Sequence, residues 1–103
     1  MTDDKMIQDL TRIIQTVKRK FTDESDLLWT TYDTAKEMRD ELDLYASQLE
    51  KNDLSCLYNL HIHFLVTSNF QEHSLMNGWS DEYLVIAGKF DNIYAKLKAN
   101  SNV

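Results

Sequence analysis

The sequence of 103 residues contains no proline and only two glycines, Gly78 and Gly88. Tight turns between β-strands depend on these residue types, so their scarcity favours a few long helices. The length suits one domain spanning residues 1–103. The content of 43% hydrophobic and 27% charged residues is typical of a folded protein and excludes a disordered one.

Cysteine and long apolar runs are also scarce. Cys56 is the only cysteine, so the chain has no internal disulfide, and no Cys/His cluster has the spacing of a zinc site. The chain contains no uninterrupted run of about 18 apolar residues, the length that could span a membrane. The first ten residues also lack the apolar core of a signal peptide. We therefore expect a cytoplasmic protein that does not bind membranes.

Basic residues are scarce in the segment 21–53, which is strongly acidic. The net charge is −6, and residues 21–53 carry ten acidic and only three basic side chains. The one basic cluster, Lys18-Arg19-Lys20, falls at the end of a predicted helix, where the helix dipole favours cations. Because nucleic-acid binding usually needs a basic surface, we expect no direct contact with DNA or RNA.

Hydrophobic periodicity predicts helices over residues 3–20 and 23–51. Apolar residues in both segments recur every three or four positions, which marks one face of a helix. In the first segment they are Ile7, Leu10, Ile14, Val17 and Phe21, and in the second they run from Leu28 to Leu49. Thr22 or Ser25 is the expected cap of the second helix, and Asn52-Asp53 its expected end.

The third predicted helix, from Leu54 to about Met76, carries little charge. In residues 54–78 only Glu72 is formally charged. An unbroken helix would turn Glu72 towards the core, and Ser68-Asn69-Phe70-Gln71 resembles a capping box. We therefore expect a kink or a restart of the helix near Ser68.

A fourth helix is predicted after the stop signal Asn77-Gly78, beginning at Ser80, with a frayed tail at about 100–103. Four helices of similar length joined by short connections favour antiparallel neighbours. The expected fold is therefore an all-α, four-helix, up-down-up-down antiparallel bundle.

The densest polar feature is a run of carboxylates on the second predicted helix. It consists of Asp33, Glu37, Asp40 and Glu41. A solvated helix face accounts for this pattern, and the alternatives are an acidic docking patch or a Mg²⁺ site built from carboxylate oxygens. The third helix supplies only Glu72 as a further acid. The sequence therefore assigns no catalytic, cofactor-binding or metal-binding residue.

The histidines do not suggest a metal site either. His61 and His63 lie about 200° apart around a helix, so they cannot share one ion. We interpret His61 as a core side chain with hydrogen-bonded ring nitrogens, His63 as a surface side chain, and Cys56 as a buried structural thiol.

The third helix also lacks the charged outer face that each helix of an isolated bundle should have. This leaves Ile62, Val66 and Phe70 as candidates for an exposed apolar surface, and surfaces of that kind mark contact sites. The alternative is that the second helix and the loop at Trp79 cover these side chains within the monomer.

Together these features favour a small, acidic, non-enzymatic protein-binding module of the inhibitor, immunity or adaptor type. Its partner is either another protein, with a basic one complementing the acidic face, or a second copy of the chain in a homodimer. The alternatives are a metal-dependent hydrolase that uses the carboxylates of the second helix, and an acidic nucleic-acid mimic that blocks a DNA-binding partner.

Overall fold

A computed structural model describes residues 2–28, 30–65 and 68–101. Every regular element in these ranges is an α-helix: α1 (Thr2–Lys20), α2 (Ala35–Glu50), α3 (Leu57–His63), α4 (Asn69–Asn77) and α5 (Ser80–Ser101). The all-helical class is confirmed. The four-helix up-down-up-down arrangement is not, because the described chain has five helices and two of them are short.

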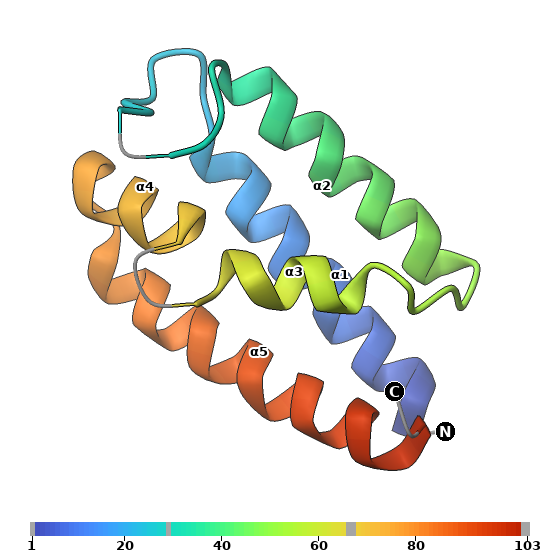
Figure 1. The fold of residues 1–103 in the computed structure, drawn as a ribbon. Coiled ribbons are helices and arrows are strands. Elements are labelled where there is room, and N and C mark those ends of the chain that lie inside the picture. The colour runs from blue at the N-terminus through green and yellow to red at the C-terminus, as the bar shows by residue number, and fades with distance from the viewer. Residues whose placement is uncertain (1, 29, 66–67, 102–103) are drawn as a thin grey trace.

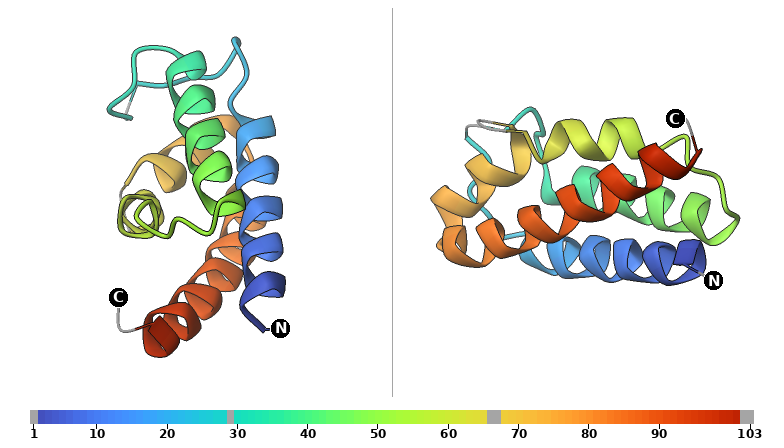
Figure 2. Two further views of the ribbon diagram at one scale, coloured as in Figure 1. Left: turned by 90° about the vertical axis from the view of Figure 1, so that its right-hand side faces the viewer. Right: turned by 90° about the horizontal axis from the view of Figure 1, so that it is seen from below.

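Three long helices form a framework that the two short ones close on one side (Figures 1 and 2). α1 packs against both α2 and α5, which run antiparallel to it, so the start of α1 and the end of α5 lie at the same end of the molecule (Figure 1). α3 and α4 lie on the side opposite α1 and pack against each other and against α5. None of the described helices combines the length and the apolar character needed to cross a bilayer.

Residues 23–28 and 30–34, which we expected to begin the second helix, form a loop instead. Ser25 Oγ accepts a hydrogen bond from the backbone N–H of Thr22, and the carboxylate of Asp26 accepts one from that of Leu28. Such side-chain bonds compete with those of a helix. The loop is then fixed to α4, where the amide of Asn77 both donates to and accepts from the backbone of Asp26.

α2 is consequently shorter than predicted, and it begins after a capping box. The hydroxyl of Thr34 accepts from the backbone N–H of Glu37, and the carboxylate of Glu37 accepts from that of Thr34. The predicted end is confirmed, because Asn52 follows the helix with a positive φ of 60°.

The predicted third helix breaks into α3 and α4, so the restart near Ser68 is confirmed. Ser68 has the extended backbone of an N-cap, but its side chain makes no capping hydrogen bond, so the expected capping box is wrong. The break brings the rings of Phe64 and Phe70 together in the core, with their centroids 4.9 Å apart.

Gly78, with a φ of 80°, ends α4 as predicted. α5 continues to Ser101, and residues 102 and 103 lie outside the described ranges.

His73 on α4 is a fully buried titratable group in this core. Its ring stacks on Phe21 with the centroids 3.8 Å apart, and its Nδ1 accepts a hydrogen bond from the indole N–H of Trp79. Burial lowers the pKa of His73 to about 4, although the nearby Asp26 acts in the opposite direction. The side chain is therefore neutral in the folded protein at pH 7.

We expect this histidine to make the fold sensitive to acid. The pKa of His73 is lower in the folded than in the unfolded chain, so between about pH 6.5 and pH 4 the unfolded chain binds more protons. The free energy of unfolding therefore decreases as the pH is lowered through this range. Between pH 7 and 4.5 the wild type should lose about 2 kcal/mol more than His73→Gln. Urea denaturation of both proteins at the two pH values measures this, and equal losses would contradict it.

Candidate functional site

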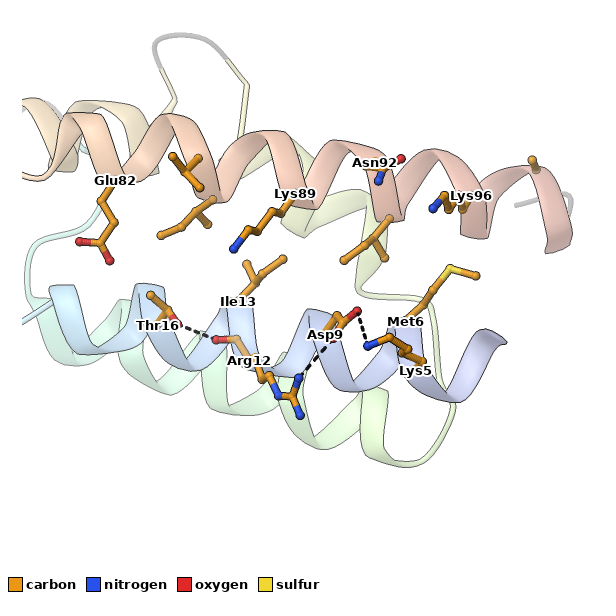
Figure 3. Close-up of a pocket in the computed structure, with 14 residues that line it drawn as sticks. Lys5, Met6, Asp9, Arg12, Ile13, Thr16, Glu82, Lys89, Asn92 and Lys96 are labelled. Carbon is orange, nitrogen blue, oxygen red and sulfur yellow. Dashed lines mark hydrogen bonds and ion pairs between the residues drawn. The ribbon is translucent and has the colours of Figure 1, made fainter. Parts of the chain in front are cut away.

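A groove with a volume of about 990 Å³ lies between α1 and α5. Its lining side chains come only from these two helices, which lie side by side (Figure 3). Ligand-binding clefts have volumes of roughly 300–1,000 Å³, so this one lies at the upper end of the range.

The floor of the groove is apolar. Met6 and Ile13 from α1 face Ile86 and Ile93 from α5. Ile13 and Ile86 belong to the core, and Met6 and Ile93 are partly buried against it. The two residues from each helix are seven positions apart, which places them on one side of that helix two turns from each other. The floor is therefore a continuous extension of the core to the surface.

The rims of the groove are polar, and most of their charged side chains are basic, although the whole chain is acidic. On α1, Asp9 lies between two cations, 3.7 Å from Lys5 and 3.5 Å from Arg12. Figure 3 shows these side chains drawn together along α1, while Lys89 extends from α5 towards α1. Lys96 lies two turns further along the same rim of α5.

The predicted acidic face on α2 is divided among separate contacts. Asp33 is exposed in the loop before the helix, and Glu37 belongs to the capping box. Asp40 pairs with Lys36 at 2.7 Å on the surface. Glu41 points the other way, into a polar cluster with His63. Across the described residues, no three His, Cys, Asp or Glu side chains are placed to hold a metal ion.

The polar cluster joins α2 to α3 and α4. The carboxylate of Glu41 accepts a hydrogen bond from the hydroxyl of Tyr45 and contacts His63 Nε2, both at 2.6 Å. His63 Nδ1 lies 3.2 Å from the amide nitrogen of Asn69, and the amide oxygen of Asn69 accepts from the backbone of Thr31. If the amide donates to Nδ1, Nε2 carries the proton and donates to Glu41. The cluster therefore connects α2, α3 and α4 through hydrogen bonds, and it also fixes the loop before α2 through Thr31.

Both histidine interpretations are wrong. His63, expected at the surface, is buried in this cluster. His61, expected in the core with both nitrogens bonded, is only half-buried. Its ring stacks on Tyr94 with the centroids 4.5 Å apart, and its Nδ1 has no hydrogen-bond partner among the described residues. Cys56 is buried as expected, and burial raises the pKa of its thiol to about 11.

The predicted apolar surface is contradicted at one of its three residues. Phe70 is 0% exposed and belongs to the core, because the break before α4 turns it inwards. Ile62 is 37% exposed on α3, and Val66 lies outside the described residues. The apolar side chains exposed near Ile62 are Tyr58 and Leu65, which lie four and three positions away.

The groove residues were missed because their signal is only half visible in the sequence. Lys5 and Arg12 are seven residues apart, as are Lys89 and Lys96, so each pair follows one helix face. The sequence does not show that these two faces meet.

Comparison with known protein families, with characterised proteins and with solved structures found no match for this chain.

Proposed function

We propose that this protein is a small non-enzymatic protein-binding module, of the inhibitor, immunity or adaptor type, which holds its partner in the groove between α1 and α5. The observation that carries the proposal is the apolar floor of Met6, Ile13, Ile86 and Ile93, open to the surface between two polar rims. An apolar centre with a polar rim is the usual anatomy of a protein–protein contact site.

The composition of the groove favours binding over catalysis. None of the histidines and no cysteine lines it, and its two carboxylates are engaged in ion pairs, Asp9 with Lys5 and Arg12, and Glu82 with Lys20 at 2.6 Å. Among the groups that act as general bases or nucleophiles, the groove therefore offers no imidazole, no thiol and no unpaired carboxylate. Elongated binding between two helices, by contrast, uses only the shape and the apolar area that the groove supplies.

A homodimer through the third predicted helix receives less support. That version needed Phe70 at the surface, and Phe70 is a core residue. The carboxylates of α2 give equally little support to a metal-dependent hydrolase, because Glu37 and Glu41 serve the capping box and the polar cluster.

Two neighbouring residues of α5 provide a matched test of this proposal. Val85 lines the groove and is 58% exposed, whereas Leu84 is 65% exposed and lies outside it. Either side chain can become arginine with a stability change of about 0.5 kcal/mol or less, because both are at the surface. Only Val85→Arg places a long charged side chain in the groove.

We expect wild type and Leu84→Arg to capture the same partner from the native lysate, and Val85→Arg to recover at least about tenfold less. Thermal melts of the three proteins confirm that each is folded. Equal recovery by all three would show that the partner binds elsewhere, and the groove would lose its proposed role.

A further inference from the structure

The charge of the groove differs in sign from that of the protein around it. Four cations and two carboxylates line the groove, in a chain whose net charge is −6. Asp9 is shared between Lys5 and Arg12, and Glu82 is taken by Lys20. Lys89 and Lys96 form no ion pair with any described carboxylate. One positive charge therefore remains uncompensated on the α1 rim, where two cations share Asp9, and two remain on the α5 rim.

The spacing of this charge has a helical repeat. Lys89 and Lys96 are seven residues apart on one helix, so their Cα atoms are about 10.5 Å apart along its axis. The floor residues Ile86 and Ile93 follow the same interval, as do Met6 and Ile13 on the other wall. A third helix laid along the groove would offer side chains at the same interval, with an apolar stripe facing down and polar residues at both edges.

One residue of α5 beside the groove has no side chain. Gly88 lies three residues after Val85 and four before Asn92, both of which line the groove. A Cβ atom added at Gly88 would meet nothing within 4 Å, so this glycine is not needed for packing inside the chain. Met6 on the opposite wall adds an unbranched side chain that adapts to the shape of its partner.

Building on the proposed function, we propose that the groove binds an acidic amphipathic helix of a partner protein. Its apolar stripe lies on Met6, Ile13, Ile86 and Ile93, and carboxylates two turns apart along its edge pair with Lys89 and Lys96. The charge of the rim selects an acidic helix over a basic one, because a basic helix would leave like charges facing each other across a desolvated contact.

Three synthetic peptides test this inference. Each is an amphipathic helix with leucine and alanine on one face, and the edge positions carry glutamate, glutamine or lysine. Binding is measured by fluorescence anisotropy of the labelled peptide. We expect the glutamate peptide to bind at least about tenfold more tightly than the glutamine peptide, and added salt to reduce that difference.

A charge swap supplies the matched variant. The double variant Lys89→Glu/Lys96→Glu should lower the affinity for the glutamate peptide at least about tenfold and raise that for the lysine peptide. The control Lys51→Glu/Lys98→Glu makes the same change in net charge at exposed lysines outside the groove. It should leave the preference for the glutamate peptide in place.

Several results would contradict the proposal that an acidic helix binds in the groove. Equal binding of the three peptides, or equal effects of the two double variants, would remove the charge selection. Binding to vesicles of anionic phospholipid that only Lys89→Glu/Lys96→Glu abolishes would make a lipid headgroup the occupant. A dimer by sedimentation that only this variant abolishes would make a second copy the occupant.

The peptide measurements and the capture experiment test the two proposals independently. If Val85→Arg abolishes partner capture while the three peptides bind equally, protein binding by the groove stands and the acidic helix does not. If Val85→Arg captures the partner as well as wild type does, the proposed function fails, and the acidic helix fails with it.

Discussion

Replacing Phe70 with alanine is expected to lower the free energy of unfolding by about 3–5 kcal/mol. The side chain is fully buried. Its ring meets Phe64 edge to face at 4.9 Å, Phe21 at 6.1 Å and His63 at 5.1 Å. Removing it leaves a cavity where α3, α4 and the end of α1 meet, and small domains have only about 5–15 kcal/mol of stability in total.

The matched control for this substitution is Leu75→Ala on the same short helix. Leu75 is 59% exposed, so its removal should change stability by about 0.5 kcal/mol or less. Urea denaturation of both variants at pH 7 measures the two effects. Similar small losses would contradict the burial of Phe70 and would restore the exposed apolar face expected from the sequence.

Helix ends set by neighbouring residues could be predicted. Asn52 and Gly78 follow α2 and α4 with positive φ values of 60° and 80°, as their residue types suggest. The burial of the apolar stripe on α1 was equally predictable, because amphipathic spacing is a property of the segment itself. These features depend on interactions over only a few positions.

The start of α2 shows where local reasoning fails. Thr34 and Glu37 have the spacing of a capping box, but the stripe beginning at Leu28 suggested an earlier start. The loop before Thr34 is held by two distant asparagines. Asn69 bonds to the backbone of Thr31 across 38 positions, and Asn77 to that of Asp26 across 51 positions. Contacts at that distance outweigh local propensity and leave no periodic signal.

The groove belongs to the same class of long-range features. Lys5 and Arg12 are separated from Lys89 and Lys96 by most of the chain. The two pairs line one groove only because α5 packs against α1, and that packing follows from the path of the chain through α3 and α4. The sequence therefore predicted the helical class and several helix ends, but it directed attention to the acidic residues of α2 rather than to the groove.

Replacing Glu41 with alanine is expected to lower the free energy of unfolding by about 2–3 kcal/mol. The carboxylate accepts a hydrogen bond from the hydroxyl of Tyr45 and contacts His63 Nε2, both at 2.6 Å. Alanine would leave these two polar groups without their acceptor between α2 and α3. Asp40→Ala is the matched control on the same helix, because its exposed pair with Lys36 contributes about 0.5 kcal/mol or less. Urea denaturation at pH 7 compares the two, and equal losses would contradict the structural role of the cluster.

The pH dependence of the Glu41 effect separates charge from packing. Burial alone would raise the pKa of Glu41, but the hydrogen bonds with Tyr45 and His63 outweigh burial and lower that pKa. A carboxyl whose pKa is lower in the folded chain stabilises the fold above its unfolded pKa of about 4.5, and this contribution disappears as the pH falls through the folded pKa. Glu41→Gln keeps the size of the side chain without its charge, so its deficit relative to wild type should be largest at pH 7 and should shrink below about pH 4.5. A deficit that stays constant with pH would assign the effect to packing, and the ionised carboxylate would then not be what joins α2 to α3.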